Sequence, residues 1–135
     1  MEVVGSNDKL LKILEMACRK ILGPEPKKQD IVHDVRSLIV EGLAAGTVHI
    51  DAIASKLSVS SKTLERRLGE RDESFSALSD TIRQDLAKQY LKDTDFRLEQ
   101  IAYLTGYSEP AALVRAFRRW TGTTPMQFRS AHRWA

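Results

Sequence analysis

The sequence predicts an all-α protein in which two helix-turn-helix subdomains are joined by a long connecting helix. Apolar residues recur every three or four positions in several separate segments, and glycine or proline stands near the ends of those segments. One layout also occurs twice, beginning at Ile53-Ala54 and again at Ile101-Ala102. A repeated pair of helices around a tight turn, with a longer helix between the copies, accounts for these observations.

The composition is that of one folded domain with, at most, an appended segment. The chain has 135 residues, of which 42% are apolar, and this is enough to form a core. The net charge is only +3, but the segment from Glu109 to the last residue holds five arginines and one acidic residue. Such local basicity is expected of a segment that contacts phosphates.

Composition and spacing also argue against several classes of protein. The three histidines are scattered, and the single cysteine, Cys18, cannot build a disulfide framework or a cysteine-based zinc site. We therefore expect no enzyme activity, no cofactor and no metal. No apolar run reaches the roughly 18 residues that span a bilayer, and no secretory signal is visible, so we expect a cytoplasmic protein without a membrane partner.

The chain divides into an N-terminal segment, residues 1–29, and a main domain, residues 30–135. Lys9 to Leu22 has one apolar side and predicts a helix, and the two prolines between residues 23 and 29 predict a linker. Three interpretations of the first helix stay open. It packs on the main domain, it is the remnant of an upstream regulatory domain, or it makes a dimer contact.

A bracing helix over residues 30–45 precedes the first helix-turn-helix, residues 49–70. Ser60 or Ser61 is expected to cap the second helix of this unit. Its turn contains Ser58, where the second unit has glycine. Either this serine adopts a strained positive φ or the two turns differ in shape.

The connecting helix is expected over residues 74–93, with Ser74 as its N-cap. Its apolar stripe consists of Phe75, Leu78, Ile82, Leu86 and Tyr90. The other face mixes both signs of charge, which predicts a solvated connector that does not contact DNA. The charged residues of that face are Asp80, Arg83, Asp85, Lys88 and Lys92.

The second helix-turn-helix is expected over residues 98–121. Gly106 can form its turn, Ser108 is a candidate N-cap for the second helix, and Gly122 ends that helix. Thr124 is expected to cap a final helix. The core side chains expected from both units are Leu64, Leu68, Leu113, Phe117 and Trp120.

Specific residues then link the chain to a known family. They are Ile101, Ala102, Gly106, Tyr107, Ser108, Arg115 to Arg119, Gly122, Thr124, Pro125, Phe128 and Arg129. At these residues the chain resembles the AraC/XylS family of bacterial transcriptional regulators, over a stretch from about Asp30 to Arg129. Leu113 departs from the family, which usually has an aromatic residue there. The resemblance implies a homeodomain-like fold with two helix-turn-helix units, about seven helices in all, plus the N-terminal helix.

The second helix of each unit, residues 61–70 and 109–120, is the one that can enter a DNA major groove. A connecting helix of about 18 residues is about 27 Å long, and one turn of DNA is about 34 Å. We therefore expect the two recognition helices to enter successive major grooves on one side of the duplex. A monomer or weak dimer would then read an asymmetric site.

The side chains at the exposed start of each recognition helix are expected to contact DNA. The expected base contacts are Lys62, Thr63, Glu65, Arg66, Ala111, Val114 and Arg115. The expected phosphate contacts are Ser61, Arg67, Ser108, Arg118, Arg119 and Thr124. The resemblance matches Lys62, Glu65 and Arg66 to base-contacting positions.

Several of these residues have an alternative role that does not involve reading bases. In that case Glu65 pairs with Arg66 or a neighbour, and Arg115 forms an intramolecular ion pair. Lys62 and Arg66 would contact phosphate only, and the two expected caps, Ser108 and Thr124, would only cap helices.

The function expected from these features is sequence-specific DNA binding by a transcriptional regulator. The resemblance implies an activator that also contacts RNA polymerase, in a bacterial cell where the protein would be associated with the nucleoid. Two forms of such a regulator stay open: a self-contained regulator made only of the DNA-binding domain, or the C-terminal domain of a longer, ligand-sensing protein whose upstream domain is absent from this chain. The short apolar helix before the linker modestly favours the second. The alternative is a helical protein-interaction module with weak or non-specific DNA binding. The apolar residues Ala111, Ala112 and Val114 slightly favour this alternative.

Overall fold

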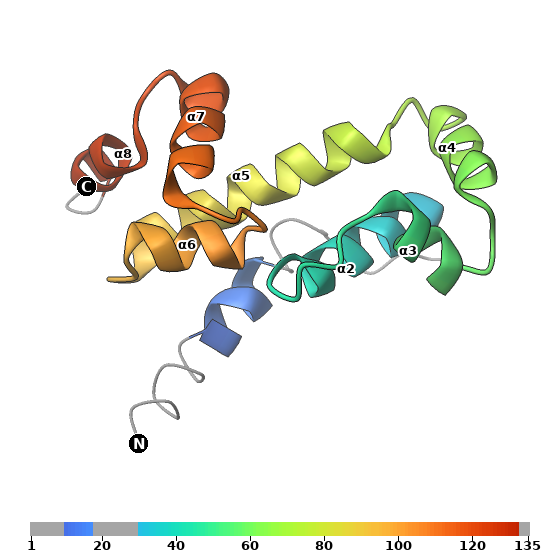
Figure 1. The fold of residues 1–135 in the computed structure, drawn as a ribbon, viewed down its shortest axis with the longest axis horizontal. Helices are drawn as coiled ribbons and strands as arrows, with labels where there is room; N and C mark the ends of the chain where they lie inside the picture. The colour runs from blue at the N-terminus through green and yellow to red at the C-terminus, as the bar shows by residue number, and fades with distance from the viewer. Residues whose placement is uncertain (1–9, 18–29, 133–135) are drawn as a thin grey trace.

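The computed structural model describes residues 10–17 and 30–132, and helices are the only regular secondary structure in these ranges (Figure 1). This confirms the all-α prediction. A first helix covers residues 10–17, and the remainder of the helix expected over Lys9 to Leu22 lies outside the described residues. The other helices are α2 (Ile31–Leu43), α3 (Ile50–Lys56), α4 (Ser61–Gly69), α5 (Phe75–Asp93), α6 (Leu98–Leu104), α7 (Pro110–Thr121) and α8 (Pro125–His132).

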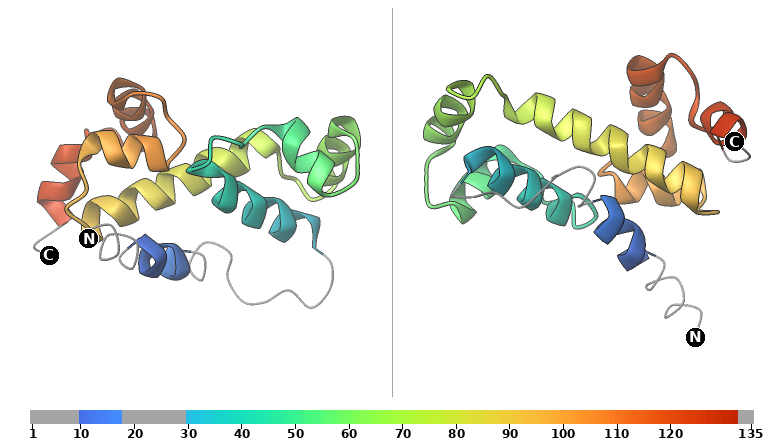
Figure 2. Two further views of the ribbon diagram at one scale, coloured as in Figure 1. Left: turned by 60° about the horizontal axis from the view of Figure 1, so that its bottom comes forward. Right: turned by 180° about the vertical axis from the view of Figure 1, so that it is seen from behind.

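The long helix α5 organises the molecule. Its 19 residues, at about 1.5 Å each, give a rod about 28 Å long. Helices α2, α3 and α4 gather towards its N-terminal end, and α6, α7 and α8 towards its C-terminal end (Figures 1 and 2). Because α5 packs against α2, α6 and α8, it buries more than the single predicted stripe. Its fully buried residues are Leu78, Ser79, Ile82, Leu86, Ala87, Tyr90 and Leu91.

One continuous apolar core joins both halves. It contains four of the five predicted core side chains, Leu64, Leu68, Leu113 and Phe117, none of which is exposed to solvent. The fifth, Trp120, packs against the core and is half-buried. Ile13 and Ala17 of the first helix are also buried in this core. The first helix therefore packs on the main domain, as one of the three interpretations requires.

Side-chain caps fix where several helices begin. The hydroxyl of Ser60 accepts from the Thr63 amide at 3.0 Å, and that of Ser74 accepts from the Ala77 amide at 3.2 Å. Each of these bonds satisfies an amide that the helix itself leaves unpaired. Both predicted caps are confirmed, with Ser60 rather than Ser61 as the cap of α4.

Helix α7 ends as predicted, at Gly122, which has the left-handed φ of 83°. The start of α2 is also fixed by a side chain. Asp30 accepts from the Val32 amide at 3.0 Å and pairs with Arg71 at 3.1 Å. Burial of the Asp30 carboxyl works against ionisation, but the Val32 amide and the charge of Arg71 hold its pKa below the usual value.

The turns of the two helix-turn-helix units begin with the same backbone conformation. Ser58 has a φ of 61° and Gly106 a φ of 88°. In each turn the next residue donates its amide to a carbonyl five residues earlier, Val59 to Ala54 at 3.0 Å and Tyr107 to Ala102 at 2.8 Å. The first of the two alternatives for the turn is therefore correct, because Ser58 adopts the conformation that favours glycine.

The two turn residues should respond differently to substitution. Gly106→Ala places a Cβ in a left-handed conformation and 3.2 Å from Leu43 Cδ2, so we expect the free energy of unfolding to fall by about 1–3 kcal/mol. Ser58→Gly relieves backbone strain but gives the unfolded chain more freedom, so we expect a change of less than about 1 kcal/mol. Urea denaturation of both variants tests this. If both variants lost the same free energy of unfolding, Ser58 would not have the left-handed conformation that Gly106 has.

Candidate nucleic-acid interface

The two predicted recognition helices, α4 and α7, lie at opposite ends of α5 in each of the views in Figures 1 and 2. Four residues, 57–60, separate α3 from α4, and five residues, 105–109, separate α6 from α7. The second turn is therefore one residue longer than the first. This geometry places two similar helix pairs on one rod.

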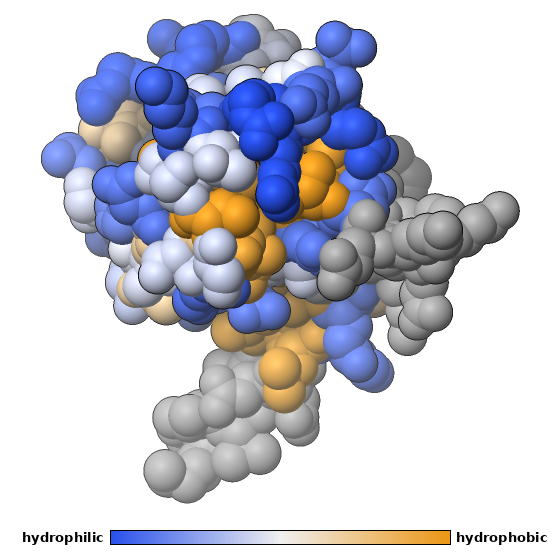
Figure 3. Space-filling view, turned by 90° about the vertical axis from the view of Figure 1, so that its right-hand side faces the viewer, coloured by the Kyte–Doolittle hydropathy of each residue, from blue (hydrophilic) through white to orange (hydrophobic). Residues whose placement is uncertain are grey.

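The exposed side of α4 carries the predicted DNA-contacting charges. Lys62, Glu65, Arg66 and Arg67 are all exposed, while the leucines of the opposite side are fully buried. Viewed from the end of the molecule that holds α4, the surface is mostly hydrophilic, with small apolar patches between the charged groups (Figure 3). These four residues are therefore available to a ligand.

Arg66 already has a partner within its own helix. Its guanidinium Nη1 lies 2.9 Å from Glu70 Oε2, and both side chains are about 60% exposed. An exposed pair at this spacing contributes about 0.3–0.5 kcal/mol, whereas a bidentate contact to guanine contributes about 1–3 kcal/mol. The pair with Glu70 therefore positions Arg66 without preventing it from contacting a base.

Two other predicted contacts in the first unit have local hydrogen bonds. The hydroxyl of Ser61 donates to the carboxylate of Asp51 on α3. The hydroxyl of Thr63 lies 2.9 Å from that of its capping residue, Ser60. Both residues therefore fix the start of α4 against its surroundings, and any contact to DNA would share the same hydroxyl.

The second recognition helix, α7, is less polar at its start and more basic at its end. Ala111 is exposed and Val114 half-buried. Arg115 and Arg118 are exposed and make no ion pair with another described residue. The intramolecular pair considered for Arg115 is therefore absent among the described residues.

Arg119 differs from the other arginines of α7. Its Nη2 lies 4.0 Å from Asp80 Oδ2, and this pair links α7 to α5. The Arg119 side chain is 63% exposed, so the pair is weakly held and its contribution to stability is small.

The prediction that Ser108 caps α7 is wrong. Glu109 occupies the N-cap position, makes no side-chain cap, and is followed by Pro110 in the first turn. The extra residue in the second turn puts Ser108 one position too early, so its side chain is exposed instead.

Thr124, in contrast, forms a reciprocal cap at the start of α8. Its hydroxyl accepts from the Gln127 amide at 3.1 Å, and the Gln127 side chain accepts from the Thr124 amide at 3.0 Å. The predicted capping role is confirmed, and the hydroxyl is already used by that role.

The prediction that Arg83 belongs to a solvated face of α5 is also wrong. Its guanidinium carbon lies 5.5 Å from the ring centroid of Tyr107, in the turn before α7, and its Nε is buried. Burial raises the pKa of the Tyr107 hydroxyl, and the neighbouring Arg83 charge works in the opposite direction. The sequence gives no indication of this contact. Helix α5 buries more than the one apolar stripe that periodicity predicts, and Arg83 lies at the edge of this larger buried surface.

Comparison with known proteins identifies the family of this chain. Residues 53–131 match the family described as a helix-turn-helix domain. The chain is 41% identical over 88 residues to the HTH-type transcriptional regulator VirS of Mycobacterium tuberculosis, covering 65% of this chain and 26% of VirS. It is 29% identical over 126 residues to an ornithine utilization regulator of Pseudomonas aeruginosa, covering 93% of this chain and 37% of that protein. The chain thus spans between about a quarter and two fifths of the length of these relatives.

A solved structure matches as well. The DNA-binding domain of AdpA, a global transcriptional factor solved in complex with a target DNA, superposes with a TM-score of 0.67 at 26% identity, covering 78% of this chain and 96% of that domain. Separately, no helix in the described part of the chain is long and apolar enough to cross a membrane. The matched region spans both helix-turn-helix units, so the chain belongs to the AraC-type helix-turn-helix family, whose members are DNA-binding transcriptional regulators and not enzymes.

Proposed function

We propose that this regulator reads an asymmetric DNA site with α4 and α7 in successive major grooves of one duplex. The observation that supports this most is the arrangement of two exposed basic helices at the two ends of one rod. The rod is about 28 Å long, close to the roughly 34 Å of one DNA turn. A monomer with this arrangement contacts two grooves without needing a symmetric partner.

The two helices divide the task unequally in this proposal. In α4, Lys62 and Arg66 donate to guanine O6 and N7, and Glu65 accepts from cytosine N4. In α7, Arg115 is the one exposed residue among the predicted base contacts that can hydrogen-bond a base, and Ala111 offers at most contact with a thymine methyl group. Helix α4 therefore discriminates between sequences, and α7 mainly anchors the protein.

A salt titration of binding tests the proposal. The probes are a random duplex and a site selected from a random-sequence pool. With three arginines at phosphates, the logarithm of the binding constant should fall with a slope of about −3 against the logarithm of salt concentration. The selected site should bind at least about a thousandfold more tightly than the random duplex.

The result that contradicts the proposal is a shallow slope with little preference for the selected site. That result would favour the helical protein-interaction module instead. The arginines that enter the expected slope are Arg67, Arg118 and Arg119, because these are the cationic side chains assigned to phosphates.

We also propose that the DNA-bound protein acts as an activator through contact with RNA polymerase. With α4 and α7 in the grooves, the side of the molecule turned away from the duplex stays free for a second protein. Transcription in vitro from a promoter that carries the selected site tests this. Stimulation by the protein supports the proposal, and repression at every position of the site contradicts it.

A further inference from the structure

An unusual group of polar atoms lies between α5 and the second helix-turn-helix. Among the described residues, three buried side-chain polar atoms have no hydrogen-bond partner: Ser79 Oγ, Arg83 Nε and Trp120 Nε1. Ser79 and Arg83 are one helical turn apart on α5, and Trp120 lies on α7. Buried polar atoms without partners are uncommon in native proteins, and the contacts of Arg83 and Trp120 with neighbouring groups are therefore of interest.

Tyr107 connects these elements. Its ring lies between the Arg83 guanidinium, whose carbon is 5.5 Å from the ring centroid, and the Trp120 ring, whose centroid is 6.4 Å away. Trp120 in turn packs edge-on against Phe117 in the core, at 6.2 Å. Arg83 is therefore connected to α7 through the tilted rings of Tyr107 and Trp120. A cation over a partly buried ring is an attractive contact that keeps its strength where water is excluded.

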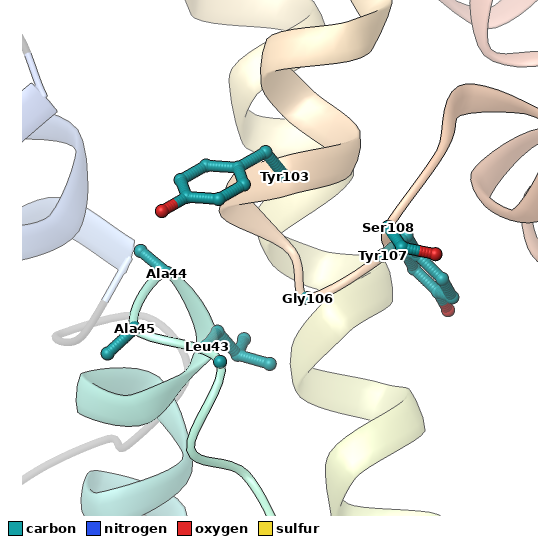
Figure 4. A pocket seen from close by; sticks show the side chains of 8 residues that line it. Leu43, Ala44, Ala45, Tyr103, Gly106, Tyr107 and Ser108 are labelled. Carbon is teal, nitrogen blue, oxygen red and sulfur yellow. The ribbon is translucent and has the colours of Figure 1, made fainter.

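The backbone of the turn lies against Arg83 as well. A Cβ added to Gly106 would be 3.5 Å from Arg83 Nε and 3.6 Å from Arg83 Nη2, and 3.2 Å from Leu43 Cδ2 of α2. Figure 4 shows part of this junction, with Leu43 at the end of α2 pointing towards Gly106, and Tyr107 next along the chain. The bracing helix α2, the connecting helix α5 and the second unit thus meet at one turn.

We propose that Arg83 is a positioning residue that sets the angle and distance between the two recognition helices. It clamps the turn of the second unit, residues 105–108, onto α5. The tie between Asp80 and Arg119 is the other charged contact from α5 to α7 among the described residues, and at 4.0 Å and largely exposed it is too weak to replace the clamp. This inference rests on the proposal that both recognition helices bind one duplex.

The test is binding to DNA sites in which the spacing between the two contacted grooves is varied. Inserting or deleting one base pair moves the second groove by about 3.4 Å and turns it by about 35°. A rigid protein cannot follow this change, so the unaltered protein should bind the original selected site far more tightly than either altered site. A protein with a loosened second unit should tolerate the change.

Arg83→Met removes the guanidinium and keeps an apolar chain of similar length. We expect affinity for the original site to fall about five- to thirtyfold, the equivalent of losing a partly desolvated cation–π contact. The penalty for altered spacing should shrink as well, and binding to a random duplex should change by less than about threefold, the loss expected from a single charge at moderate salt. Arg83→Lys keeps a cation over the ring and should restore part of the spacing dependence.

Two further variants make the result decisive. Lys92→Gln removes the same charge from α5, nine residues further along and away from the turn, and should leave the spacing dependence unchanged. Tyr107→Leu removes the aromatic partner of Arg83 and so abolishes the same contact. It replaces Arg83→Met in the test if circular dichroism shows Arg83→Met to be unfolded. It should give the same relaxed spacing dependence.

Retention of the full spacing penalty by the folded Arg83→Met or Tyr107→Leu variant would overturn the inference. So would an equal loss by Arg83→Met on every site and on random DNA, because that is the effect of charge alone. If the unaltered protein itself showed no spacing dependence, the proposal of two successive grooves would fail instead, so the two failures are distinguishable.

Discussion

Phe117→Ala is expected to lower the free energy of unfolding by about 3–5 kcal/mol. Phe117 of α7 is completely buried. Its ring packs edge-on against those of Phe128, on α8, and Trp120, with ring centroids 5.4 Å and 6.2 Å away. Removing it leaves a cavity where α7, α8 and the core meet. Because small domains are stabilised by only about 5–15 kcal/mol, urea denaturation should show a large shift of the midpoint.

Met126→Ala is the control for this measurement. Met126 lies on α8, near Phe128, but it is 47% exposed, so we expect its replacement to cost less than about 1 kcal/mol. A loss below about 1 kcal/mol for Phe117→Ala would contradict the packing described for the second unit, because a fully buried aromatic side chain would then contribute nothing to the core.

Arg66→Ala is expected to have the largest effect on recognition. It should weaken binding to the selected site by about 1–3 kcal/mol and relax the preference at one base pair. Loss of the exposed pair with Glu70 contributes only a few tenths of a kcal/mol to folding, so the variant should remain folded. Competition binding with each base substituted in turn measures both the loss of affinity and the relaxed position.

Arg118→Ala is the matched comparison. Arg118 is equally exposed but lies in the last turn of α7, where we expect it to contact phosphate. Its replacement should weaken selected and random duplexes alike and reduce the salt slope by about one unit. If Arg66→Ala also weakened both duplexes equally, Arg66 would be a phosphate contact and the assignment of base reading to α4 would be wrong.

Much of the fold could be predicted because its determinants are local. Helical periodicity indicates the seven helices from α2 to α8, and the hydroxyls of Ser60, Ser74 and Thr124 fix helix starts through bonds to amides only three residues away. Gly122 likewise ends α7 through its own backbone conformation. Ser108 was assigned wrongly because a cap depends on the length of the turn, and the second turn is one residue longer than the first.

The features that the sequence could not predict depend on contacts between distant elements. Periodicity places Arg83 on the charged side of α5, but whether that side meets solvent or Tyr107 depends on how the turn of the second unit folds back. Arg71 is a similar case, because its pairing with Asp30 joins residues 41 positions apart. The exposure of Lys62, Arg66 and Arg115 in the structure agrees with the predicted interface, while their contacts to bases stay predictions.

A hydroxyl-radical footprint on the selected site tests the central claim most directly. If α4 and α7 occupy successive major grooves on one side of the duplex, protection should appear in two stretches whose centres are about 10–10.5 base pairs apart. The Arg66→Ala and Arg115→Ala variants should each weaken one stretch more than the other. Protection confined to a single groove by the unaltered protein would contradict the claim.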